Sequence, residues 1–216
     1  MAPRGIRAFL LAAALALPGS APGAGAAPAD DLLPRLRSRA AGERIEAVQK
    51  LGETGRMRHS APLAALLKDE DAGVRDAAHD ALWAIWMRSG DPEVDALMRR
   101  GVVWMEQGLP EKAVETFSEM IELKPNFAEG WNKRATALYM AKRYRESVAD
   151  CEKTLALNPH HFGALFGLGL NYVGLRDWEG AISAFRKTLV VLPHSEAAAR
   201  YIEAIERALA ESRKKL

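Results

Sequence analysis

The chain has 216 residues, with 30 lysines and arginines against 28 aspartates and glutamates, and its formal net charge is +2. Arg4 and Arg7 are the only charged residues among the first 29, so the remainder is neutral, which argues against a nucleic-acid binder or a protein held on anionic membranes. A single cysteine excludes an internal disulfide framework and any multi-cysteine metal site, and the alanine-rich composition with 7% aromatic residues favours helices over a β-sandwich.

Residues 1–29 predict an export signal. The two arginines precede the apolar run 9–17, Pro18 follows that run, and a stretch of small residues comes next. This order is typical of a secretory signal peptide, with an organellar transit peptide as the alternative. The apolar run is too short for a bilayer span, which takes about 20 residues. We therefore expect a periplasmic or secreted protein with no stable membrane insertion after signal cleavage. The candidate cleavage positions follow Ala26, Ala27 and Ala29.

Residues 30–90 contain a short internal period. At a shift of 31 residues, the segment 44–48 aligns with 75–79, and Leu51 aligns with Leu82. This segment is similar to short HEAT-like repeats, whose helices often begin with a Val-Arg pair after an Asp-rich turn. The resemblance implies about two helical units in this part of the chain.

Two structural roles are expected for polar and aromatic residues of this segment. Arg75 is expected to form an ion pair with Asp69 or Asp71, which would join neighbouring helices rather than make a site. Trp83 and Trp86 lie three residues apart, on one side of the same expected helix. We expect them to seal the junction with the part of the chain that follows residue 90.

Residues 94–195 repeat with a period of 34 and without an insertion. In each copy a large residue, a small residue and a second large residue stand at positions i, i+4 and i+7. This spacing places all three on one helix face. A proline ends each copy, where it stops the second helix. The aligned columns are Leu97, Trp131 and Leu165; Gly101, Ala135 and Gly169; Trp104, Leu138 and Tyr172; Ala113, Ser147 and Ala181; Phe117, Cys151 and Phe185; and Pro125, Pro159 and Pro193.

These columns resemble tetratricopeptide repeats, with the pattern W-x2-L-G-x2-Y…A-x3-F…P. The copies are 94–127, 128–161 and 162–195, within a domain that spans 91–216; the third copy matches most fully. After the last copy, Ser195 to Arg213 is expected to form an amphipathic helix that caps the array. The predicted fold is therefore an all-α helical-repeat solenoid, in which a HEAT-like segment precedes three helix pairs and a capping helix.

No residue pattern supports catalysis, a cofactor or a metal site. Cys151 shares the column of Phe117 and Phe185 and is therefore expected to lie in the core as a small hydrophobic side chain. His160 and His161 are adjacent in a turn, where their side chains diverge, and are expected to be solvated. Phosphate-binding loops, nucleophile elbows and zinc-protease motifs are absent from the sequence.

The candidate binding surface is the concave face of the repeats. Residues about 100° from the packing stripe of each first helix would line this groove, and seven of the nine are apolar or aromatic. Members of the tetratricopeptide family commonly hold extended peptides or helices there, and some clamp a carboxylate at the end of the partner. Only Asn132 fits such a clamp here, with Arg99 and Lys133 beside it, so an apolar segment is the expected ligand. The predicted groove residues are Met98, Val102, Met105, Asn132, Thr136, Tyr139, Phe166, Leu170 and Val173.

These observations predict a non-catalytic, exported adaptor that binds a protein or peptide partner. Two alternatives come from other classes of function. One is an envelope assembly factor for a cofactor-bearing protein, because similar repeats serve cytochrome c maturation and similar HEAT-like repeats occur in bilin lyases. The other is a structural homo-oligomer of the cell envelope. The groove could also be filled by the capping helix or by a second copy of the chain.

Overall fold

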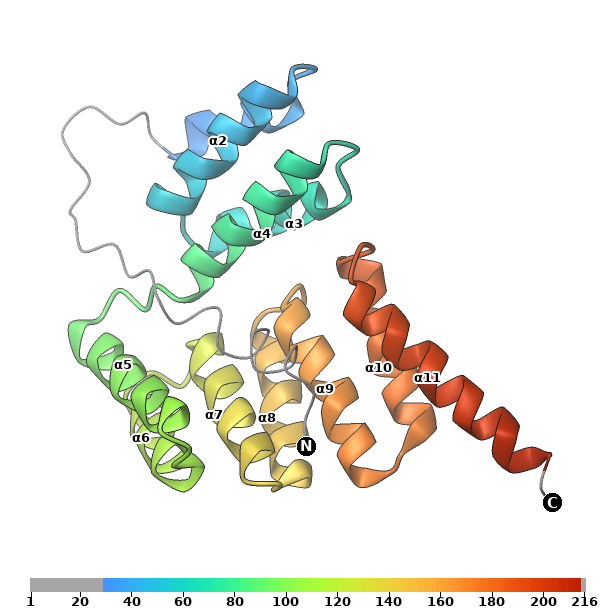
Figure 1. The fold of residues 1–216 in the computed structure, drawn as a ribbon. Helices are drawn as coiled ribbons and strands as arrows, with labels where there is room; N and C mark the ends of the chain where they lie inside the picture. Colours follow the sequence, from blue (N-terminus) through green and yellow to red (C-terminus); the bar gives the residue numbers. More distant parts are fainter. Residues whose placement is uncertain (1–28, 215–216) are drawn as a thin grey trace. The chain divides into compact units, whose positions relative to one another are not determined.

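The computed structural model describes residues 29–214, apart from the side chain of Arg213, and every regular element in this part of the chain is helical. The chain divides into two compact units between Gly90 and Asp91, called unit 1 and unit 2 below (Figure 1). The predicted all-α helical-repeat fold is confirmed. The predicted signal peptide lies outside the described residues, except for Ala29.

Unit 1 is built around a packed pair of helices, α2 and α4, with shorter helices beside them. Its core consists of aliphatic side chains with no exposed surface, contributed by both α2 and α4 and by the short helices between them. Because these positions recur at helical spacing, they form the buried stripe of each helix. The elements are the 3-10 helix η1 (Ala29–Arg37), α2 (Ala41–Thr54), η2 (Met57–His59), α3 (Ser60–Ala65), η3 (Leu66–Lys68) and α4 (Ala72–Trp86).

Arg44 and Arg75, which the 31-residue shift aligns, make the same backbone hydrogen bonds. In both residues the Nη1 atom donates to the carbonyl oxygens of the residues five and six positions earlier in the chain. Arg44 also forms an ion pair with Asp69, at 2.7 Å between Nη2 and Oδ1. The first copy of the short period is thereby bonded to the second.

The predicted ion pair of Arg75 is wrong. Its guanidinium bonds the carbonyl oxygens of Asp69 and Glu70, and the carboxylate of Asp69 accepts from Arg44 instead. The carboxylate of Asp71 accepts a hydrogen bond from the backbone N–H of Val74 and so caps the start of α4. The carboxylate of Asp71 is therefore used at the N-terminus of α4, and that of Asp69 is used by Arg44, so neither pairs with Arg75.

Trp86 is a core residue of unit 1. Its side chain is 2% exposed, and its indole Nε1–H donates to Oγ of Ser60 at 3.2 Å. The ring of Trp83 meets that of Trp86 edge-on, with 5.6 Å between centroids, but remains half-buried. At least one of the pair therefore has a packing role inside the unit. Sealing of a junction with the following residues stays a prediction.

Unit 2 consists of three successive helix pairs and a final longer helix, which follow one another in chain order (Figure 1). Within each pair the two helices pack closely, and the second helix of each pair also contacts the first helix of the next. This arrangement buries a continuous core along the array. The pairs are α5 (Pro92–Glu106) with α6 (Pro110–Leu123), α7 (Ala128–Met140) with α8 (Tyr144–Leu157), and α9 (Phe162–Leu175) with α10 (Trp178–Val191), followed by α11 (Glu196–Arg213).

The column of small residues, Gly101, Ala135 and Gly169, is explained by close helix packing within each pair. A Cβ atom added to Gly101 or Gly169 would overlap the ring of Phe117 or Phe185, respectively. In the second pair Ala135 takes the place of the glycine, and Cys151, which is smaller than phenylalanine, takes the place of the ring. Both residues are buried in one cluster. A larger residue on the first helix is therefore accompanied by a smaller one on the second, which keeps the packed volume similar.

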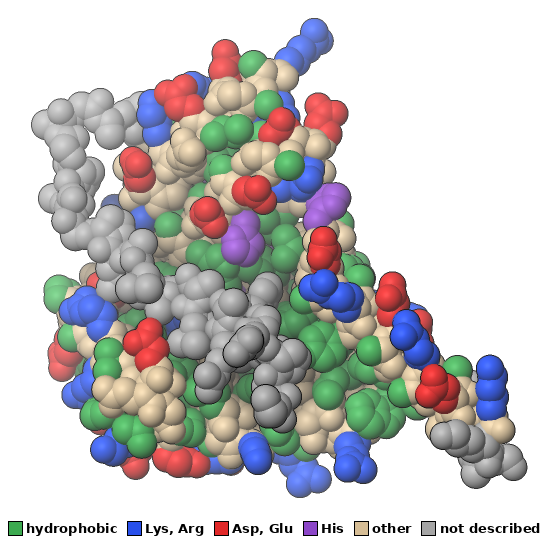
Figure 2. All heavy atoms as spheres, viewed as in Figure 1, with side chains coloured by type: hydrophobic (Ala, Val, Ile, Leu, Met, Phe, Trp, Pro, Cys, Tyr) green, Lys and Arg blue, Asp and Glu red, His purple; other side chains and the backbone are tan. Residues whose placement is uncertain are grey.

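The last helix in the described part of the chain, α11, packs against α10. Ala198 and Ile205 are buried, whereas the position 34 residues after Gly169 is Glu203, which is exposed. α11 therefore lacks the small residue that allows close helix packing in the three pairs. Figure 2 shows charged side chains of both signs along the outer side of α11, as expected for a polar-backed cap.

Candidate functional site

The predicted groove residues lie on the first helices α5, α7 and α9, at three successive levels of each helix. The structure buries six of them almost completely and leaves three half-buried. The half-buried residues are close to the C-terminal ends of α7 and α9. The buried residues are Met98, Val102, Met105, Asn132, Phe166 and Leu170, and the half-buried residues are Thr136, Tyr139 and Val173.

Phe166 on α9 is packed against aromatic side chains of α10 and α11. Its ring centroid lies 5.3 Å from that of Phe185 and 5.9 Å from that of Tyr201 on α11. Tyr201 in turn stacks on Phe185, at 4.9 Å and with an interplanar angle of 15°. α11 therefore covers this end of the predicted groove with one aromatic side chain.

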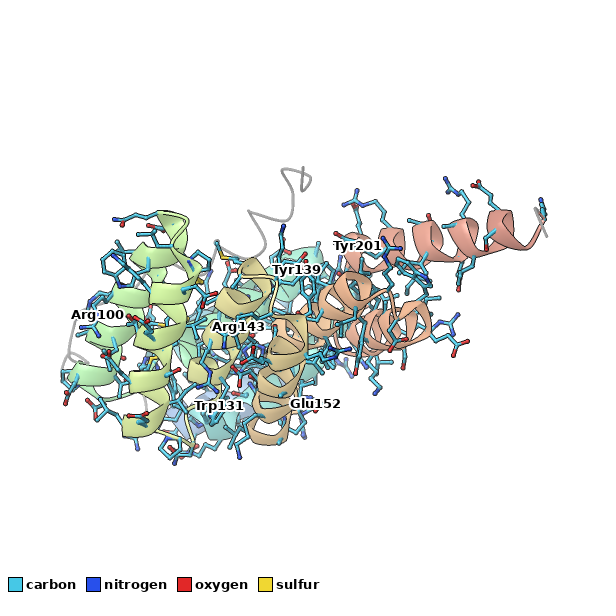
Figure 3. All side chains as sticks on the ribbon, turned by 90° about the horizontal axis from the view of Figure 1, so that it is seen from below. Arg100, Trp131, Tyr139, Arg143, Glu152 and Tyr201 are labelled. Carbon is cyan, nitrogen blue, oxygen red and sulfur yellow. The ribbon has the colours of Figure 1, made fainter. Side chains whose placement is uncertain are left out.

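Tyr139 is the large aromatic residue of the predicted groove that remains partly accessible. Its ring contacts that of Tyr144 at 5.7 Å, and Figure 3 shows Tyr139 and Tyr201 on the same side of unit 2. Burial raises the pKa of Tyr139, and the nearby hydroxyls of Tyr201 and Tyr144 raise it further. An amphipathic side chain of this kind offers both an apolar surface and a hydroxyl to a ligand.

Four polar or charged side chains form a buried cluster in the second and third helix pairs, which sequence reasoning did not identify. Glu129 on α7 lies at the centre, with no exposed surface. Its Oε1 atom accepts from Nδ2 of Asn132 at 3.1 Å and lies 3.4 Å from Nζ of Lys133. Its Oε2 atom lies 2.8 Å from Nε2 of His161, at the start of α9. We call these four residues the Glu129 cluster.

Hydrogen bonds determine which ring nitrogen of His161 carries the proton. Nδ1 accepts from the backbone N–H of Ala164 at 3.1 Å, so it caps the N-terminus of α9 and cannot itself be a donor. Nε2 therefore carries the hydrogen and donates it to Glu129. Burial alone raises the pKa of Glu129, but Lys133, His161 and Asn132 together outweigh this effect and hold the pKa below its ordinary value. Glu129 is thus an ionised buried carboxylate.

The expectation that the turn histidines are solvated is right for His160 and wrong for His161. His160 is exposed, whereas His161 has no exposed surface. The 34-residue period indicates the capping role of His161. The residue 34 positions later is Ser195, whose hydroxyl caps α11 by accepting from the N–H of Ala198. A polar residue two positions after the column proline marks a helix N-cap.

Cys151 is buried, as its column predicts, and burial is the main cause that raises the pKa of its thiol to about 12. A second buried polar network adjoins it. Nδ2 of Asn171 donates to Oγ of Ser147 at 2.8 Å, and this hydroxyl donates to the carbonyl oxygen of Ala135 at 2.7 Å. The network joins α7, α8 and α9 and has a structural role.

Arg134 and Asp150 form a bidentate ion pair between α7 and α8, at 2.7 and 2.8 Å. The guanidinium also donates to Ser118 of α6 and lies over the ring of Trp131. Arg99, the other cation considered for a clamp, is exposed on α5.

Within residues 29–214 there is no group of three or more histidine, cysteine or acidic side chains placed to hold a metal ion. In the same part of the chain, no helix combines the length and apolar character needed to cross a bilayer.

Models of the tetratricopeptide repeat match residues 63–126, 128–161 and 163–195. The chain contains tetratricopeptide repeats. The matches at 128–161 and 163–195 agree with the predicted second and third copies, whereas the match at 63–126 begins inside the segment predicted to be HEAT-like. The HEAT-like resemblance of residues 30–90 stays a prediction.

Curated proteins are similar to part of this chain. A tetratricopeptide repeat-containing protein of Rhizobium etli is 31% identical over 132 residues, which cover 59% of this chain and 63% of that protein. The Hsp70-Hsp90 organizing protein of Triticum aestivum is 32% identical over 102 residues, which cover 47% of this chain and 18% of that protein. The matched region thus spans less than two thirds of either relative.

Solved structures show the same fold. The first tetratricopeptide domain of Spaghetti (RPAP3), bound to the HSP90 peptide SRMEEVD, superposes with a TM-score of 0.53 at 23% identity, covering 55% of this chain and 94% of that chain. MamA superposes with a TM-score of 0.53 at 25% identity, covering 65% of this chain and 85% of that chain. The human RPAP3 second domain, in complex with the HSP70 peptide SGPTIEEVD, gives a TM-score of 0.51 at 22% identity and covers 53% of this chain and 95% of that chain.

Proposed function

We propose that this protein is a non-catalytic adaptor, which binds a segment of a partner protein along the first helices of its tetratricopeptide repeats. The observation that carries the proposal is the half-buried set of Thr136, Tyr139 and Val173, because each of these side chains keeps some accessible surface on α7 or α9. The remaining groove residues are apolar apart from Asn132, and they give this surface a rigid support. Shape and apolar contact would supply most of the affinity.

Peptide recognition by neighbours of the same fold supports this proposal. Two of the similar tetratricopeptide domains were solved with peptides of HSP90 and HSP70. Their identity to this chain is 23% and 22%, so the shared feature is the fold and not the ligand. The partner of this protein is therefore inferred to be a protein segment, and its chemistry depends on residues specific to this chain.

We also propose that the protein acts after export, in the periplasm or outside the cell. The proposal rests on the basic, apolar and small-residue order of residues 1–29. N-terminal sequencing of the protein recovered from the periplasm or the medium tests it. A mature N-terminus after Ala26, Ala27 or Ala29 is expected, and an intact N-terminus in the cytoplasmic fraction would contradict export.

Unit 1 is proposed to be a HEAT-like support for the adaptor. The equivalent backbone hydrogen bonds of Arg44 and Arg75, one period apart, favour two copies of one structural unit. The ion pair of Arg44 with Asp69 bonds these copies to each other. Limited proteolysis of the whole protein tests whether the segment 30–90 resists cleavage as one unit, as a repeat pair should.

Site-specific photo-crosslinking in the native host tests the adaptor proposal. A photoreactive amino acid replaces Tyr139 on α7 and, as the matched control, exposed Glu152 on α8. A discrete adduct at position 139 that is absent at position 152 is expected, and mass spectrometry then identifies the partner. Equal labelling at both positions, or none at position 139, contradicts binding along the first helices.

Light scattering of the purified protein tests the homo-oligomer alternative. A monomer whose mass does not change with concentration is the expected result for an adaptor. A stable dimer, together with a crosslink from position 139 to a second copy of the same chain, would favour self-association instead. That result would assign the surface around Tyr139 to an isologous or heterologous interface.

A further inference from the structure

We propose that Glu129 is a built-in carboxylate ligand of the second repeat, which occupies the donors of Asn132 and Lys133 so that the groove selects an apolar partner segment without an acidic terminus. This inference rests on the proposed adaptor function and specifies the chemistry of the partner. It makes Glu129 a specificity-determining residue rather than one that contacts the partner.

The donors of the second repeat are already used within the chain. Asn132 belongs to the predicted groove, and Lys133 follows it on the same helix. Both point their nitrogen atoms at Oε1 of Glu129, one turn earlier on α7, at 3.1 and 3.4 Å. Side chains of these three residues are almost completely buried. A ligand carboxylate would have to displace Glu129 to reach the same nitrogens.

His161 completes the shell around the carboxylate. Its Nε2–H donates to Oε2 of Glu129 at 2.8 Å, while its other ring nitrogen is held by the N–H of Ala164. Both oxygens of Glu129 therefore have donors, from an amide, an ammonium and an imidazole. This composition is that of an anion-binding site, because charged and neutral donors converge on one carboxylate. The anion belongs to the chain itself.

A second carboxylate near this cluster would meet an existing negative charge in a low-dielectric environment. Like charges repel strongly there, and the single lysine of the cluster already has a partner. The peptides bound by the two RPAP3 domains, SRMEEVD and SGPTIEEVD, end in Glu-Glu-Val-Asp and carry several carboxylates. Two other cations of the first helices are also paired within the chain, Arg100 with Glu119 and Arg134 with Asp150. Arg99 is exposed on α5 and does not belong to the Glu129 cluster. Exclusion of acidic termini is therefore built into α7.

Peptide binding by the wild-type protein tests the inference without a variant. The probe is fluorescently labelled SGPTIEEVD, with a free C-terminal carboxylate or with a C-terminal amide, in titrations followed by anisotropy. We expect no binding of either form, or affinities that agree within about threefold. A preference of about tenfold or more for the free carboxylate would overturn the proposal, because it requires an open carboxylate site.

Chemical rescue tests whether the cluster is an anion site that the chain fills itself. Glu129→Ala removes the carboxylate and leaves a space beside the three donors, and Glu129→Gln fills that space without charge. Formate is added to both variants and to the wild type, with chloride at equal ionic strength as the control. We expect a saturable rise in the unfolding midpoint of Glu129→Ala with formate, several-fold larger than in Glu129→Gln or in the wild type.

Equal responses of the three proteins to formate and chloride would overturn the inference. If Glu129→Ala does not fold without formate, recovery of the helical signal on refolding with formate, but not with chloride, is the supporting result. The failure of this inference is distinguishable from failure of the adaptor function. A preference for the free carboxylate leaves the adaptor intact and refutes only the role of Glu129. Absence of any crosslink at position 139 refutes the adaptor, while the formate experiment still decides the occupant of the site.

Discussion

Glu129 and His161 stand 32 residues apart in the chain and meet at 2.8 Å between Oε2 and Nε2, with neither side chain exposed. The contact joins the first helix of the second repeat to the N-terminus of the first helix of the third. His161 uses its second ring nitrogen to cap α9. One side chain therefore supports both a helix start and a buried carboxylate.

Replacing His161 by alanine should destabilise unit 2. The variant loses the cap of α9 and leaves the buried Glu129 without one of its donors. The expected cost is about 2–4 kcal/mol in the free energy of unfolding. Urea denaturation followed by circular dichroism measures it. The neighbouring exposed His160→Ala is the control and should stay within about 0.5 kcal/mol of the wild type.

Glu129→Gln should remove part of the acid sensitivity of unit 2. The pKa of Glu129 is lower in the folded protein than its ordinary value of 4.5. Its ionised form therefore stabilises the fold above about pH 4.5, and this contribution is lost as the pH falls through the lower folded-state pKa. The unfolding free energy of the wild type should fall more steeply below about pH 4.5 than that of the variant. Parallel pH profiles of the two proteins would show that the pKa of Glu129 does not differ between the folded and the unfolded protein.

Tyr139→Ala should weaken binding of the partner identified by crosslinking by about 1–3 kcal/mol, as for an aromatic anchor in an interface. The change in unfolding free energy should be smaller than the loss of binding, because the side chain is half-buried. Calorimetric titration and thermal unfolding measure the two quantities. Tyr139→Phe keeps the ring and serves as the control. A loss of stability with unchanged binding would identify Tyr139 as a core residue.

Gly169→Ala should destabilise the third repeat by about 1–3 kcal/mol, because the added methyl group overlaps the ring of Phe185. The second repeat carries the alternative combination, Ala135 with Cys151, in the same two columns. In a Phe185→Cys background, Gly169→Ala should therefore cost less than in the wild type. A double-mutant cycle measures this coupling, and additive costs would show that the two columns do not compensate each other.

Cys151 should be unreactive toward iodoacetamide in the folded protein. Burial raises the pKa of the thiol to about 12, and Asp150 opposes its ionisation further, so the reactive thiolate is scarce at pH 8. Mass spectrometry should find no adduct until urea unfolds the protein. Labelling that tracks the unfolding transition is the expected result. Rapid labelling of the native protein at pH 8 would place the thiol at an accessible position.

The period of 34 residues and the column of small residues were sufficient to predict helix pairs, the close approach at Gly101 and Gly169, and the burial of Cys151. These features are local or recur in every copy, because helical spacing alone places the residues on one face. The cap at Ser195 could be expected because serine is favoured at the N-cap of a helix. The polar partners could not be predicted in this way, as the wrong assignment for Arg75 shows.

The amino-acid sequence by itself determined the repeat architecture, because each copy has the same stripe of small and large apolar residues and the same terminal proline. Only the tertiary structure decided that Asp69 pairs with Arg44, that Tyr201 covers Phe166, and that Glu129 holds the donors of the second repeat. Those choices depend on which polar groups are buried together when helices from different copies pack, and burial is what makes each unpaired group costly.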